Sequence, residues 1–162
     1  MTVSKRILAA TLLVFAPLAL GACGSEAAPP PVADKQAIPD LAFEDSALIL
    51  PAVTGRPGVV YGTFINTGDR DLAIRTVAVK GAGKTELHAS MEMNGQMTMG
   101  ETGPQLVPAN GRMKLEAGGL HVMVFDIAPE IAAGGTAALT VTVAGGDSAT
   151  FEIPVRAAGD PR

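Results

Sequence analysis

The chain has 162 residues, enough for one folded domain and an additional segment, and its net charge is −4. Aromatic residues make up 4% and charged residues 17%, Trp is absent, and glycine and proline together number 31. This composition favours an all-β domain with many turns over a helical one, and the acidic balance argues against a nucleic-acid-binding protein.

The first 22 residues have the pattern of a bacterial export signal. Lys5 and Arg6 precede an apolar run of 14 residues, which is too short to span a bilayer comfortably. The run ends in LGAC, which resembles the lipobox of bacterial lipoproteins, whose cysteine is lipidated and becomes the first mature residue. We therefore predict a signal peptide over residues 1–22 and lipidation at Cys23, the only cysteine of the chain. The alternatives are an ordinary secretory signal cut near Ala22 and an anchoring helix.

Lipidation would place the mature protein outside the cytoplasm, held to the membrane by acyl chains rather than by a spanning helix. It would also occupy the only thiol, so a site for a soft metal would have to use methionine. Without the two basic residues of the signal the net charge is −6. Residues 23–40 are predicted to be the lipidated Cys and a flexible Pro- and Ala-rich tether, residues 41–157 the domain, and residues 158–162 a short tail.

Within the predicted domain, apolar and β-branched runs alternate with turn signals every eight to twelve residues or so. Strands are expected at residues 42–51, 58–66, 72–80, 85–93, 96–100, 112–116, 120–127, 136–143 and 149–155. Eight or nine short strands in this arrangement are typical of a β-sandwich or barrel. Pro154 suggests that the last strand lies at a sheet edge, and residues 128–135 read as a connector with room for one helical turn.

The dipeptide Asn94–Gly95 predicts a tight hairpin turn between two of these strands. A two-residue loop would pair residue 93 with 96, 92 with 97, 90 with 99 and 88 with 101. Because opposed residues share a face and the face alternates along each strand, the side chains divide into two sets. One face would carry His88, Ser90, Glu92, Met97 and Met99, and the other face Met91, Met93 and Thr98.

His121 and Met123 are two residues apart on a later strand, so they also share a face. Both histidines of the chain and six of its seven methionines lie between residues 88 and 123. Thioether sulfur and imidazole together suit Cu(I), whereas zinc seldom takes thioether ligands and a blue-copper centre needs a cysteine thiolate. The two imidazoles and two thioethers would converge if the later strand pairs with the hairpin or packs across from it.

Packing is the competing explanation for each of these residues taken singly, because methionine is a common core filler. Met91 and Met93 are candidates for plain core residues, and Met113 is expected in the core. Met97 could be a spare or entry ligand at the mouth of a site. Glu92 shares the site face but is expected to be a solvated strand residue.

The spacing His88, ten residues, Met99, twenty-one residues, His121, one residue, Met123 resembles the motif of the periplasmic copper chaperone domain, the PCuAC family. Local matches in YGTFINTGD (61–69), TELH, QMTM and GGLHVM extend the resemblance over most of residues 41–156. The segment ASMEM departs from the family by placing its two methionines one step later. The chain also ends RAAGDPR, without the His- and Met-rich tail of some relatives, so a single site is expected.

The resemblance implies a cupredoxin-like Greek-key β-sandwich that binds one Cu(I) per chain through His88, Met99, His121 and Met123. It implies a lipid-anchored metallochaperone in the cell envelope, not an enzyme, which delivers copper by ligand exchange. The implied acceptor is the copper site of a cytochrome c oxidase subunit, or another copper chaperone. The alternative is a metal-free interaction or adhesion β-sandwich lipoprotein, in which the four side chains would be scattered.

Overall fold

The computed structural model describes residues 38–93 and 95–160, so the predicted signal peptide, Cys23 and most of the predicted tether lie outside the described residues. The described chain is all-β, which confirms the predicted fold class. Its strands are β1 (Leu41–Ile49), β2 (Gly58–Asn66), β3 (Leu72–Val79), β4 (Ala82–Met93), β5 (Gln96–Glu101), β6 (Gln105–Val107), β7 (Gly111–Leu115), β8 (Leu120–Ile127), β9 (Thr136–Val143) and β10 (Ser148–Arg156). No helix in these residues is long and apolar enough to cross a membrane.

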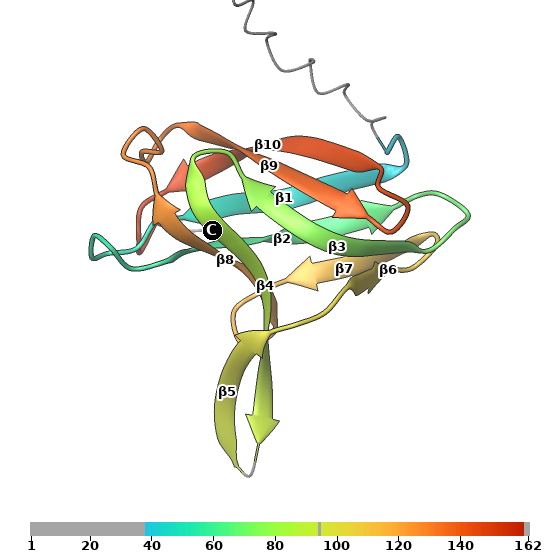
Figure 1. The fold of residues 1–162 in the computed structure, drawn as a ribbon, viewed down its shortest axis with the longest axis horizontal. Coiled ribbons are helices and arrows are strands. Elements are labelled where there is room, and N and C mark those ends of the chain that lie inside the picture. The colour runs from blue at the N-terminus through green and yellow to red at the C-terminus, as the bar shows by residue number, and fades with distance from the viewer. Residues whose placement is uncertain (1–37, 94, 161–162) are drawn as a thin grey trace, which may run out of the picture. The chain divides into compact units, whose positions relative to one another are not determined.

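The strands form two layers that share one hydrogen-bonded path, ordered β5-β4-β8-β2-β1-β10-β9-β3-β6, with β7 also paired to β2. The first layer runs from β5 to β1, and the second from β10 to β6 (Figure 1). The layers join where the ends of β1 and β10 pair in parallel, at Leu48 with Val155 and Ile49 with Arg156. This is a β-sandwich, as the turn spacing predicted.

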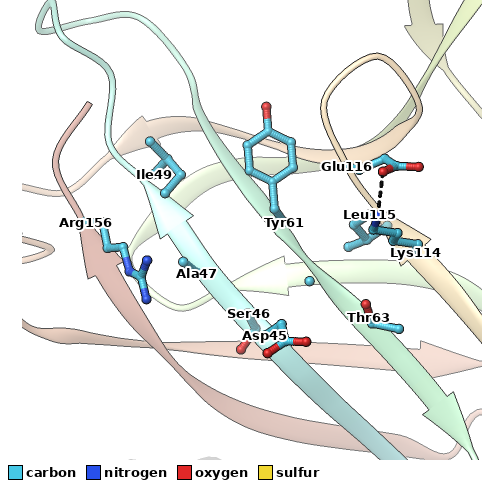
Figure 2. A pocket seen from close by; sticks show the side chains of 11 residues that line it. Asp45, Ser46, Ala47, Ile49, Tyr61, Thr63, Lys114, Leu115, Glu116 and Arg156 are labelled. Atoms are coloured by element: carbon cyan, nitrogen blue, oxygen red, sulfur yellow. Dashed lines mark ion pairs between the residues drawn. The ribbon is translucent and has the colours of Figure 1, made fainter. Parts of the chain in front are cut away.

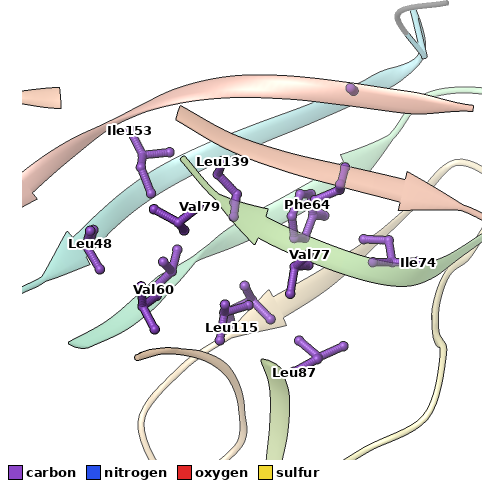
Figure 3. Packing of buried hydrophobic residues seen from close by; sticks show 14 of the residues in the cluster. Leu48, Val60, Phe64, Ile74, Val77, Val79, Leu87, Leu115, Leu139 and Ile153 are labelled. Carbon is purple, nitrogen blue, oxygen red and sulfur yellow. The ribbon is translucent and has the colours of Figure 1, made fainter. Parts of the chain in front are cut away.

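The core fills the space between the two layers because alternate residues of each strand point inward. Leu48, Val60 and Phe64 enter from the first layer, and Ile74, Leu139 and Ile153 from the second (Figure 3). All six are 1% exposed or less. Burying each of these side chains stabilises the fold by about 1.5–3 kcal/mol.

A bulge in β1 lies next to the place where Phe43 packs on β2, on the core side of the first layer. The pairing of β1 with β2 shifts between Glu44 and Ala47, and Asp45 in the bulge has a φ of 50°. Gly62 of β2 has a φ of 149°, and a Cβ there would lie 2.6 Å from the ring of Phe43. Glycine at this position therefore lets the Phe43 ring pack directly on the β2 backbone.

The structure differs from the sequence-based expectations at three places, which are the segment that forms β6, the connector after β8, and Pro154. β6 falls in a segment expected to be a loop, and the connector after β8 contains no helical turn. The expectation that Pro154 marks an edge strand is wrong, because β10 lies between β9 and β1 in the sheet order. The pairing with β1 is limited to residues 155 and 156, however, so residue 154 itself pairs only with β9. Since the Val155 amide donates to Gly135 on the β9 side, the nitrogen of Pro154 faces away from β9, where a proline interrupts no bond to that strand.

Candidate metal centre

Three adjacent strands, β5, β4 and β8, carry the four predicted ligands on the outward face of the first layer. His88 on β4 pairs directly with His121 on β8. The opposite face of β4 and β8 belongs to the core, where Leu87, Val122 and Val124 are buried. The strand pairing that the sequence left open is therefore β4 with β8, side by side in one sheet.

The two imidazole rings lie close together, with their centroids 6.0 Å apart and their planes tilted by 47°. His121 is only 4% exposed, and the side chain of His88 is 16% exposed. The ring of Phe125 lies 6.4 Å from that of His88 and contributes an apolar wall. Two borderline nitrogen donors thus meet at a shielded position near the surface.

The turn between β7 and β8 sets the orientation of His121. Gly118 in this turn has a φ of 79°, a value that glycine adopts without strain. The carbonyl oxygen of Gly119 lies 3.0 Å from Nδ1 of His121, and it also accepts the amide of Ser90 at 3.1 Å. Because a carbonyl only accepts, Nδ1 of His121 carries the proton, which leaves the lone pair of Nε2 for a metal.

Glu86 holds the other imidazole. Its Oε2 lies 3.0 Å from Nε2 of His88, and its other oxygen forms an ion pair with Lys84. Because a carboxylate accepts, Nε2 of His88 carries the proton and Nδ1 keeps its lone pair. The Lys84 hydrogen bond, followed by that of His88, holds the pKa of Glu86 below its ordinary value of 4.5, and Glu86 raises the pKa of Lys84.

Glu86 is a site residue that the sequence pattern alone did not predict. The signal was present, because Glu86 is two residues before His88 and must share its face on a strand. The structure also pairs Glu86 with Met123 across β4 and β8. Glu86 therefore lies between a predicted nitrogen ligand and a predicted sulfur ligand.

The two predicted methionine ligands are both diagonal neighbours of His88, Met123 across the β4–β8 pair and Met99 across the β4–β5 pair. Met123 lies on β8 beside His121 and is half-buried. Met99 lies on β5 opposite Ser90, so it is diagonal to His88, about 7–8 Å away at the backbone. Its side chain is 62% exposed. The structure thus pairs His88 with His121, places Met123 two residues along β8 from His121, and leaves the exposed Met99 on the edge strand β5.

The structure also tests the predicted hairpin register and the predictions for Met91, Glu92 and Met113. The pairing of Met93 with Gln96 and of His88 with Glu101 confirms the register predicted from Asn94–Gly95. Met91 was a candidate core residue, but this is wrong, because its side chain is 50% exposed. Glu92 is exposed, as expected. Met113, by contrast, belongs to the core as predicted.

Within residues 38–93 and 95–160, no three His, Cys, Asp or Glu side chains form a group that could hold a metal. Thioethers are outside that set of donors, so a mixed histidine and methionine site is compatible with it.

A separate hollow of about 420 Å³ lies at the β1 bulge. Its lining includes Asp45, Tyr61, Arg156 and the ion pair between Lys114 and Glu116, which are labelled in Figure 2. None of the four predicted ligands lines this hollow. The candidate metal centre is therefore a surface site on a sheet and not the floor of this groove.

Residues 41–155 match the sequence profile of a family described as "Putative lipoprotein LpqE-like". The chain belongs to the LpqE-like family. A curated relative, "Putative lipoprotein Lxx21020" from Leifsonia xyli subsp. xyli (strain CTCB07), is 27% identical over 97 residues. That alignment covers 59% of this chain and 58% of the relative, so the match spans little more than half of the relative's length.

Among solved structures, this LpqE-like chain has the fold of PCuAC domains. The copper-bound PCuAC domain from PmoF2 matches with a TM-score of 0.60 and 20% identity, over 75% of this chain and 97% of that domain. The Cu(I) form of DR1885 from Deinococcus radiodurans matches with a TM-score of 0.61 and 22% identity, over 80% of this chain and 87% of that protein. At such identities the likeness establishes the fold, and it confirms the resemblance in fold that the motif spacing predicted.

Proposed function

We propose that this LpqE-like protein is an extracytoplasmic, lipid-anchored Cu(I) carrier that hands its copper on by ligand exchange. The observation that carries the proposal is the His88–His121 pair across β4 and β8. Glu86 and the carbonyl of Gly119 leave each ring one lone pair. Met123 beside the pair and Met99 at its open side would supply soft sulfur donors.

The ligand chemistry favours carriage over permanent binding. Four neutral ligands leave Cu(I) with its positive charge, and an exposed thioether can leave the metal while another protein's ligand takes its place. The copper remains Cu(I) throughout, so no electron transfer is needed. A metal-binding role also uses both histidines as ligands and leaves neither for catalysis.

Lipidation at Cys23 and the tether over residues 23–40 complete the proposal, since they would hold the domain at the membrane surface. Membership of a family described as lipoproteins supports this anchoring. The acceptor that we propose is the copper site of a cytochrome c oxidase subunit, on the strength of the motif resemblance. Another copper chaperone is the second candidate acceptor.

An anaerobic Cu(I) titration against a chromophoric Cu(I) chelator tests the metal site. The protein would be purified from membranes in detergent, and its intact mass would establish that the sulfur of Cys23 is lipidated and not a competing ligand. We expect one tightly held equivalent, weakened strongly in His121→Ala and His88→Ala and more mildly in Met123→Ala and Met99→Ala. Met91→Ala is a matched control, because Met91 is an exposed methionine on the same hairpin but on its other face.

If the wild type took up no copper, or if its binding were indifferent to all four substitutions, the carrier proposal would fail. The protein would then be better described as a metal-free interaction module.

A further inference from the structure

The end of the β4–β5 hairpin extends past the rest of the sheet. The last pair between β4 and β8 is Ala89 with Leu120, while the pairing of β4 with β5 continues to Met93 and Gln96. Figure 1 shows this part of the hairpin projecting from the sandwich. Beyond Ala89, the hairpin is therefore a two-stranded ribbon, and no third strand of the described residues pairs with it.

This ribbon exposes methionine to an unusual degree. Among the side chains that the structure describes, five large hydrophobic ones are exposed, and three of them are Met91, Met97 and Met99, with exposed fractions of 50%, 63% and 62%. Core packing does not account for them, because at least half of each residue is exposed and none belongs to the buried core. A soft ligand that must meet a copper donor in solution, by contrast, has to be exposed.

Two of the three methionines form a row that leads to the histidines. Met97 and Met99 are two residues apart on β5, about 7 Å along the strand, so they share a face. Met97 pairs with Glu92, and Met99 is the diagonal neighbour of His88 on that same face. Met91 pairs with Thr98 and therefore lies on the other face. The row runs from Met97 near the tip, through Met99, to His88.

We propose that Met97 is an entry ligand, which with Met99 forms a transient Cu(I) site on the exposed hairpin. The inference rests on the proposed function. Two thioethers without an imidazole hold Cu(I) more weakly than the histidine group, so copper would move inward. The bond from copper to Met97 sulfur breaks as a bond to an imidazole nitrogen forms, while Met99 stays bound and the copper stays Cu(I). The long, unbranched methionine side chains allow this movement without a change in the backbone.

The copper-transfer rate separates an entry ligand from a resident ligand. Anaerobic stopped-flow mixing would follow Cu(I) leaving a chromophoric chelator for the lipidated protein in detergent, with Met97→Leu compared with the wild type. Leucine keeps the apolar volume and removes the sulfur. We expect transfer to slow on the order of tenfold, while the equilibrium affinity stays within about a factor of two of the wild type. A small-molecule donor excludes any effect of Met97 on protein docking.

Met91→Leu is the matched control, since it removes an exposed sulfur from the same hairpin but from the other face, and its transfer rate should equal that of the wild type. Equal rates for Met97→Leu and the wild type would overturn the entry role while leaving the proposed function intact. A loss of equilibrium affinity in Met97→Leu would overturn it too, because Met97 would then be a resident ligand. A wild type that takes up no copper would instead remove the proposed function itself.

Discussion

Glu86 is the residue through which the sheet controls His88. It accepts from Nε2 of His88 and is itself held by Lys84, so the imidazole has a fixed tautomer and a fixed plane. Partners of this kind typically change metal affinity by about 10–100-fold when they are removed. We therefore expect Glu86→Ala to weaken Cu(I) binding by about that factor, measured by competition with a Cu(I) chelator.

Two further variants make this test specific. Glu92→Ala removes an exposed carboxylate from the same face of the same strand and should leave the affinity unchanged. Glu86→Gln keeps an acceptor oxygen for His88 and should retain most of the affinity. If Glu86→Ala behaved like Glu92→Ala, Glu86 would have no positioning role.

The same carboxylate has a predicted titration behaviour. The hydrogen bond from Lys84 is the larger cause that lowers the pKa of Glu86 below 4.5, and the contact with His88 is the second. Because the folded pKa is depressed, the contact stabilises the fold fully above pH 4.5 and loses this effect as the pH falls through the folded pKa. In copper-free protein, a carboxyl ¹³C NMR titration should show the pKa of Glu86 rising in Lys84→Met. An unchanged pKa in that variant would mean that Lys84 does not hold the carboxylate in solution.

At the scale of the elements, Asn66 joins the end of β2 to two other segments. It is 1% exposed, and its Nδ2 donates to the carbonyls of Arg70, Val107 and Pro108 at 2.7, 3.2 and 3.1 Å. Its Oδ1 accepts the amide of Gly68 at 3.0 Å. Asn66→Ala leaves these buried groups without their partner, so we expect the free energy of unfolding to fall by about 2–3 kcal/mol.

Urea unfolding measures this loss as a lower midpoint with an unchanged slope. Thr67→Ala is the adjacent control, because its exposed hydroxyl makes only a 3.3 Å contact with the carbonyl of Asp40. The control should stay within about 0.5 kcal/mol of the wild type. Similar midpoints for the two variants would mean that Asn66 is not the residue that fixes this corner.

Other elements separate what a sequence can predict from what it cannot. The hairpin register was predictable, because Asn94–Gly95 fixes the loop length and the loop length fixes every pair after it. β6 was not predictable, because three residues are too few to display a period. The exposure of Met91 was missed for a different reason, since alternation assigns a residue to a face but does not say whether another element covers that face.

At the scale of the whole molecule, the site depends on a pairing between strands that are distant in sequence. Strand β8 begins more than twenty residues after β4 ends, and their register alone places His88 opposite His121. Residue types and spacing identified His88 and His121 as candidate ligands. That their strands, β4 and β8, pair directly with each other is visible only in the folded structure. The two proposed sulfur ligands differ in their place in the sheet, because Met123 lies on the interior strand β8 while Met99 lies on the edge strand β5.

Because the proposed ligands lie on β4, β5 and β8, copper would link an edge strand to the interior of the sheet and so stabilise the folded chain. Binding to the folded state alone adds about 4 kcal/mol to the free energy of unfolding when free copper is a thousandfold above the dissociation constant. We expect anaerobic calorimetry to show a higher Tm with Cu(I) than without it. The increment should be absent in His121→Ala and retained in Met91→Leu. The increment is the informative quantity, since removing the buried ring of His121 lowers the Tm of the copper-free protein by itself. An equal increment in His121→Ala and the wild type would place the copper elsewhere in the chain.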